Sequence, residues 1–169
     1  MTYRPQSHLI AGAMYDKIVA APAIAAAVTA KTLRVFYGPA ISDRASRFEL
    51  FIGADGKETD IVSAVEWTDD NIGSDIAETV TVPCAVFGRD GVATNIRELA
   101  EQAGQLAAAA AQAVKGALVV GLDPQMWCIV PDYNIALMQT PNGAEVVINF
   151  TIRTTKYLVG LFSAIGTQE

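Results

Sequence analysis

The sequence is poor in the residues that most enzymes use for chemistry. It contains one histidine and two cysteines among 169 residues. His8 would have to serve any Ser-His-Asp triad, and no G-x-S-x-G nucleophile elbow occurs. Cys84 and Cys128 lack the C-x-x-C spacing of zinc or thioredoxin sites. We therefore expect both cysteines to be free, buried thiols in a reducing compartment.

Clusters of basic residues are also missing. The chain has 12 Lys and Arg against 18 Asp and Glu, for a net charge of -6. Phosphate affinity comes from grouped Lys and Arg, so this composition excludes a protein that grips nucleic acid. The acidity is concentrated in residues 43–78, where ten acids and three bases sum to -7, whereas residues 1–42 sum to +3.

Long uninterrupted apolar runs are missing as well. The most apolar stretch, residues 9–30, contains Asp16, Lys17 and Pro22, which excludes a membrane-spanning helix. The apolar segment after Arg4 is too short for a signal peptide. Because 51% of the residues are hydrophobic, intrinsic disorder is excluded too. We expect one folded domain over residues 1–169 that neither enters a membrane nor is exported.

Hydrophobic periodicity predicts the order of the secondary-structure elements. Helical spacing covers residues 8–20 and 94–115, with a short helical turn over 23–30. Alternating or β-branched segments predict strands over residues 32–37, 47–52, 61–67 and 76–87, and a β-hairpin over 126–157. This order predicts an α+β fold with an antiparallel or mixed β-sheet, flanked by an N-terminal helix and one long helix and closed by a β-hairpin.

Local signals add details to this prediction. Pro83 has no N–H, so the strand 76–87 is expected to lie at a sheet edge or to be bulged there. The strand 47–52 is expected to be half-buried. Residues 68–75 are predicted to form an acidic loop and residues 88–91 a turn. For the long helix, Thr94 is the candidate N-cap and Gly116 the candidate C′ residue.

Few side chains are candidates for catalysis or metal binding. Asp69, Asp70 and Asp75 could bind a cation, but their spacing is not that of a calcium loop, and a solvated acidic loop is favoured. Carboxylates such as Asp123 and Asp132 leave open a small enzyme or a ligand-binding α+β domain. No cofactor or metal site is predicted. The missing catalytic set favours a binding or structural protein over an enzyme.

Three stretches resemble the tail terminator proteins of long-tailed bacteriophages: IAETVTVPCAVFG (76–88), the helix at 94–115, and the hairpin that ends in VVINFTIRTTKY (146–157). The resemblance implies a structural virion protein, not an enzyme and without a cofactor. It would cap the tail tube as a homo-oligomeric, typically hexameric ring and join the tail to the head–neck, with DNA passing through its channel without specific binding.

The same resemblance implies the partners and the location. The partners would be the tail tube protein and the neck or head-completion proteins. The location would be the tail or neck of a virion assembled in the host cytoplasm. Another neck or tail-completion protein, or a host-encoded scaffold protein, remains an alternative.

Interface candidates lie mostly in loops, which commonly carry contacts between proteins. The acidic candidates are Asp55, Glu58, Asp69, Asp70 and Asp75. The basic candidates, Arg153 and Lys156, are expected on the polar face of the last strand. Segment 43–78 could line a channel and repel phosphate, form a solvated outer hairpin, or meet the basic N-terminal part of the next subunit.

Overall fold

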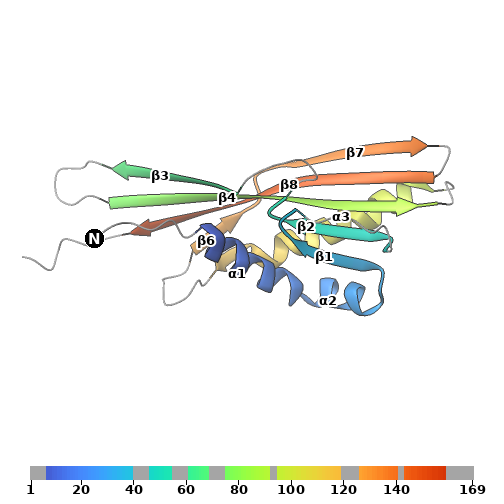
Figure 1. Ribbon diagram of the computed structural model, residues 1–169, viewed down its shortest axis with the longest axis horizontal. Coiled ribbons are helices and arrows are strands. Elements are labelled where there is room, and N and C mark those ends of the chain that lie inside the picture. The colour runs from blue at the N-terminus through green and yellow to red at the C-terminus, as the bar shows by residue number, and fades with distance from the viewer. Residues whose placement is uncertain are drawn as a thin grey trace, which may run out of the picture.

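A computed structural model describes residues 7–39, 46–54, 61–68, 75–91, 95–118, 126–140 and 143–158. Three helices pack against a large, twisted β-sheet (Figure 1). The sheet is mixed, because β1 and β2 run parallel and the other pairings are antiparallel. The predicted α+β class is confirmed.

The helices form close to where the sequence predicts them. They are α1 (Ser7–Val19), α2 (Pro22–Thr29) and α3 (Ile96–Val114). Pro22 opens α2, where its missing N–H leaves no bond unmade.

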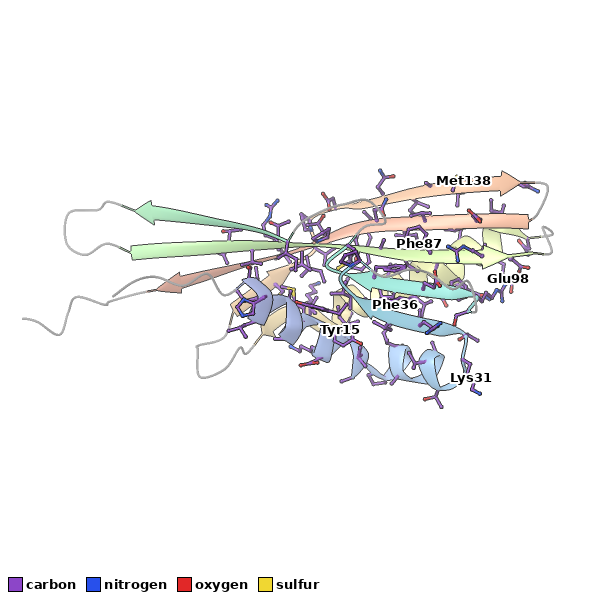
Figure 2. All side chains as sticks on the ribbon, in the orientation of Figure 1. Tyr15, Lys31, Phe36, Phe87, Glu98 and Met138 are labelled. Carbon is purple, nitrogen blue, oxygen red and sulfur yellow. The ribbon has the colours of Figure 1, made fainter. Side chains whose placement is uncertain are left out.

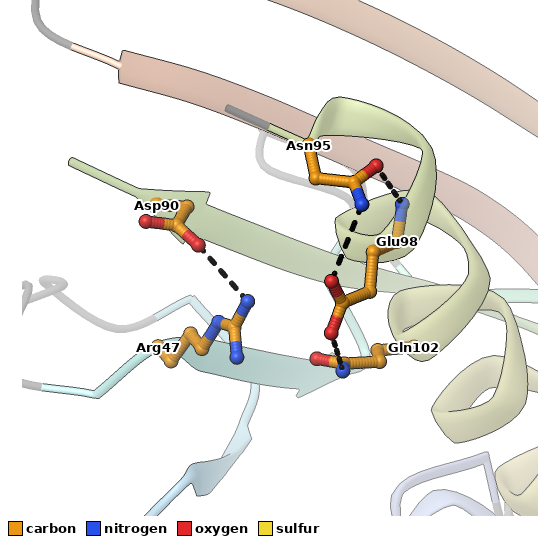
Figure 3. A network of polar contacts seen from close by, with 5 residues as sticks. All are labelled: Arg47, Asp90, Asn95, Glu98 and Gln102. Atoms are coloured by element: carbon orange, nitrogen blue, oxygen red, sulfur yellow. Dashed lines mark hydrogen bonds and ion pairs between the residues drawn. The ribbon is translucent and has the colours of Figure 1, made fainter. Parts of the chain in front are cut away.

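The ends of α3 differ from the prediction. Asn95, not Thr94, is the N-cap: its Oδ1 accepts a hydrogen bond from the Glu98 N–H at 3.2 Å (Figure 3). The Glu98 carboxylate accepts bonds in turn from Asn95 and Gln102. At the other end Lys115 is the C-cap, so Gly116 occupies the predicted C′ position. It does not take the left-handed conformation typical of that position but begins β5.

The strands are β1 (Leu33–Tyr37), β2 (Phe48–Ile52), β3 (Val62–Thr68), β4 (Asp75–Asp90), β5 (Gly116–Leu118), β6 (Met126–Ile129), β7 (Tyr133–Thr140) and β8 (Gly143–Leu158). Their order is β1-β2-β4-β8-β6-β5, with β3 also paired to β4 and β7 also paired to β8. The predicted hairpin is confirmed as β7–β8, and its first apolar run, β6, is a separate strand on β8.

The long strands β4 and β8 form the middle of the sheet. Their antiparallel register runs without a bulge from Ile76 opposite Leu158 to Asp90 opposite Ala144. One half of this pair is flanked by β2 and β7, and the other half by β3 and β6. The predicted turn at 88–91 is therefore wrong for residues 88–90, which are paired in β4. The predicted loop at 68–75 is wrong at its ends, because Thr68 pairs with Asp75.

Pro83 lies in the centre of the sheet, so the predicted edge or bulge is wrong. It stands opposite Thr151 in the unbroken ladder with β8. On its other side, β2 ends its pairing at Cys84 and β3 begins its own at Thr81. The Pro83 carbonyl accepts a hydrogen bond from the Gly53 N–H there. Proline is tolerated because its missing N–H falls where β4 changes neighbours.

The core lies between the sheet and the helices. Alternate residues of β4 and β8 face the helices and are fully buried: Val80, Val82, Cys84, Val86, Val146, Ile148, Phe150 and Ile152. Helix α3 presents Leu99, Ala103, Ala107, Ala110 and Val114 to them. Its small side chains allow close packing, and Gly104 lies next to the Ile148 side chain. Strand β2 is buried on both faces, so the predicted half-buried pattern is wrong.

Replacing a glycine by alanine is expected to have opposite effects on stability at Gly143 and at Gly104. Gly143 begins β8 with φ +129°, and a Cβ there would collide with the Asp90 carbonyl oxygen. Gly143→Ala should therefore lower the free energy of unfolding by about 2–4 kcal/mol. Gly104→Ala, in a helix interior with only an ordinary contact to Ile148, should raise it by about 0.5–1 kcal/mol. Urea denaturation of both variants would measure the difference, and equal stabilities would contradict the described backbone of Gly143.

Candidate assembly surface

The residues that most often carry chemistry are dispersed in the described part of the chain. His8 is exposed in the first turn of α1. Burial raises the pKa of the Cys84 thiol to about 12, and burial also raises the pKa of the Cys128 thiol. Both thiols are therefore protonated at neutral pH and face the core as apolar groups. No group of three or more His, Cys, Asp or Glu suited to a metal ion occurs among the described residues.

A small hollow lies beside one candidate carboxylate. Asp132 is exposed at its edge, and Tyr133, Asn134 and Asn149 help to line a volume of about 170 Å³. The Asn149 Oδ1 is buried without a hydrogen-bond partner. Asp123 lies outside the described residues, and in the described lining Asp132 has no second carboxylate beside it. This geometry offers no pair of carboxylates for acid–base chemistry.

Three of the predicted interface residues lie in one end of the sheet. There, β3 and the adjoining parts of β4 and β8 run beyond the helices (Figure 1). Asp75 begins β4, Arg153 is exposed on β8, and Lys156 stands opposite Glu78 in the register. The other four candidates, Asp55, Glu58, Asp69 and Asp70, lie outside the described residues.

Of the two basic candidates, Arg153 is the one whose side chain the structure describes. It is exposed on β8 and stands opposite Thr81 in the register with β4. Its neighbours Ile152 and Thr154 are buried, so position 153 belongs to the face away from the helices. The side chain of Lys156 lies outside the described part, and a shared basic face stays a prediction.

The sheet face opposite the helices carries an aromatic row that the sequence analysis missed. Phe51 stacks on Phe36 with ring centroids 5.0 Å apart and meets Phe87 edge-on at 5.4 Å. Figure 2 shows Phe36 and Phe87 on neighbouring parts of this sheet. The Arg34 guanidinium lies 5.3 Å from the centre of the Phe36 ring. The alternation in β2 gave a signal for this row, since Phe51 falls between the core-facing residues Leu50 and Ile52.

Beside the aromatic row, one acidic side chain is buried. Glu49 is 1% exposed, and its Oε2 lies 3.3 Å from Nη1 of Arg89. Arg89 also lies 3.9 Å from the carboxylate of Glu145 on β8. Glu49 belongs to the acidic segment 43–78, and its carboxylate contributes to the packing of the sheet. This member of the segment is thus not part of a solvated loop.

Exposed large apolar side chains fall mainly into two groups in the described part. The first group lies on β7: Tyr133, Ile135, Leu137 and Met138. The second lies on α1, α2 and β1: Leu9, Val28 and Tyr37. Figure 2 shows Met138 at one edge of the molecule and, at the opposite side, Tyr15 and Lys31, which lie between members of the second group in the sequence. Where such side chains form a contiguous patch, they can mark a surface that a partner covers.

No single helix in the described ranges is long and apolar enough to cross a membrane. Helices α1 and α2 meet the length and composition together, but they bend by 70° where they join.

Comparison with known proteins gives a likeness in fold. No family model matches the sequence, and no curated protein matches it. Among solved structures, a chain in the virion of a native gene transfer agent particle superimposes with a TM-score of 0.53. The match covers 92% of this chain and 100% of that chain, at 14% sequence identity. At this identity the comparison shows a shared fold.

The buried thiols predict slow modification in the native state. With a pKa near 12, the Cys84 thiolate is about 10⁻⁴ of the total at pH 8, so iodoacetamide should label it only after unfolding. Because the folded pKa lies above that of the unfolded chain, the thiol favours folding below about pH 9 and loses this contribution as the pH rises toward 12. Mass spectrometry after timed labelling, with and without urea, measures this, and fast native labelling would contradict the described burial.

The buried carboxylate predicts unequal effects of two arginine substitutions. Arg89→Ala removes a cation beside the buried Glu49 and should lower the free energy of unfolding by about 2–4 kcal/mol. Arg97→Ala is the matched control, because Arg97 is 87% exposed and pairs with Glu101 along the surface of α3. Its cost should stay below about 0.5 kcal/mol. Urea denaturation at pH 7 measures both, and similar costs would contradict a structural role for the Glu49–Arg89 pair.

Proposed function

We propose that this chain is a structural protein of a phage-type virion, and specifically a tail terminator. It would form a hexameric ring, as the family resemblance implies, on the end of the tail tube. The likeness in fold to a chain of a gene transfer agent virion, over nearly the whole length of both chains, is the observation that carries the proposal.

The surface described above supports a role in assembly. Two groups of exposed apolar side chains lie at different parts of the molecule, one on β7 and one on α1, α2 and β1. A subunit of a closed ring needs two such surfaces, one for each neighbour. The dispersed chemical residues of the described part fit a protein that works through contacts rather than catalysis.

The net negative charge of the chain is compatible with a channel through which DNA passes. With a net charge of -6, a ring of these subunits would repel the phosphate backbone instead of holding it. In this proposal the partners are the tail tube protein on one side and neck or head-completion proteins on the other. The protein acts in the tail or neck of the virion, after assembly in the host cytoplasm.

A tube-capping assay tests the proposal directly. The proposal implies that the same genome encodes a tail tube protein. That protein is allowed to polymerise, and the purified chain is added during growth. Tubes should stop growing and carry a ring at one end in negative-stain electron microscopy, because a cap blocks the surface to which the next tube ring binds. Tubes grown with an equal amount of serum albumin are the control.

Two results would count against a terminator. Tubes that keep growing and carry no cap would contradict the proposal. A ring that binds isolated heads but leaves tube growth unchanged would assign the chain to the neck instead.

A further inference from the structure

The two groups of exposed apolar side chains point to the way in which copies of the chain meet. We propose that strand β7 of one copy docks beside β1 of a second copy, over its helices α1 and α2, in a head-to-tail contact. The inference rests on the proposed function, because it assigns the subunit interface of the proposed ring.

In the described part of the chain, β7 is an edge strand that pairs with β8 alone and lacks the usual protection against pairing. Its eight residues, YNIALMQT, include no charged residue and no proline. Its register with β8 is straight, from Tyr133 opposite Phe150 to Thr140 opposite Gly143. Proteins normally blunt an exposed edge with charge, proline or a bulge. An apolar edge without these features is expected where another chain covers the strand.

The sheet extends past its own helical layer at β7. Tyr133, Ile135 and Leu137 stand opposite Phe150, Ile148 and Val146 of β8 and belong to the same face. The three β8 residues are buried, whereas those of β7 are between 49% and 57% exposed. The difference arises because α3 packs mainly over β8 and β4. Among the described residues, helical cover over this row of β7 is therefore slight.

The opposite side of the molecule has the complementary arrangement. Helices α1 and α2 lie on the β1 side, away from β7 (Figure 1). Leu9 on α1 and Val28 on α2 are exposed there, as are the small residues Ala25 and Ala26. These helices offer a neighbouring copy the apolar cover that β7 lacks.

Strand directions favour the same contact. Strand β1 runs parallel to β2, and β2, β4, β8 and β7 then alternate in direction, so β7 runs antiparallel to β1. A copy placed alongside in the same orientation would continue the sheet by antiparallel pairing. The side chains of Leu33, Val35 and Tyr37 belong to the helix-facing side of β1, as Ile135 and its neighbours do on β7.

Charge also differs between the two sides. Lys31 and Arg34 are exposed beside and on β1, and Asp132 is exposed just before β7. Glu145, opposite Met138 of β7, adds a second partly exposed carboxylate. Opposite charges across the contact would guide the two different surfaces together and disfavour pairing of β7 with another β7. Contacts between unlike surfaces close into rings when the rotation permits.

The test introduces a charge into each surface. Ile135→Glu should weaken self-association about 100-fold, because it places a carboxylate in an apolar contact. Val28→Glu should do the same from the other side. Ile129→Glu is the matched control, since Ile129 is 54% exposed but lies on β6. Sedimentation velocity over a range of concentrations measures association, and circular dichroism checks that each variant is folded.

A mixture of the two variants distinguishes the geometry. Each variant keeps one intact surface, so Ile135→Glu and Val28→Glu chains together should form dimers that neither forms alone. Pairing of β7 with β7 would instead leave Val28→Glu chains fully associated.

The outcomes separate this inference from the proposed function. A wild-type chain that stays monomeric, an Ile135→Glu variant that associates normally, or a mixture without dimers would overturn the inference. If the tubes are still capped in any of these cases, the function stands without the interface. If the variants behave as expected but the wild-type chain caps no tubes, the interface stands without the function.

Discussion

The antiparallel pairing of β4 with β8 is the interaction on which the rest of the structure depends. Each strand has 16 residues, and the two remain in register over nearly all of this length. The shorter strands cover the pair in two halves, and the helices cover one of its faces. Every surface discussed above is positioned by this ladder: the β7 edge, the aromatic row, and the end that runs beyond the helices.

The helical layer follows from the size of its side chains. Alanines and one glycine on α3 let the helix approach the sheet closely, and the helix packs mainly over β4 and β8 and little over β7. Helices α1 and α2 carry exposed apolar side chains on the β1 side. The position of the helices on the sheet thus determines which apolar residues are buried and which remain exposed.

Much of this fold could be predicted from the sequence, because periodicity reports which residues face the core. The alternation of Val146, Ile148, Phe150 and Ile152 predicted one buried face of β8, and the stripe of α3 predicted its packing. The failures share a physical origin. The position of Pro83 and the double burial of β2 depend on which strands pair across the sheet, and local patterns do not contain that information. The exposed apolar residues of β7 likewise depend on the sheet order, which local patterns do not contain.

The proline at the change of neighbours has a consequence for the evolution of the molecule. Because Pro83 has no N–H, β4 leaves no unpaired donor where β2 ends and β3 begins. The part of the sheet built from β3 and the adjoining segments of β4 and β8 is thereby separable from the part that the helices cover. Relatives could lengthen or shorten that outer part by pairs of residues, which preserve the facing of every side chain, while the covered core keeps its sequence constraints.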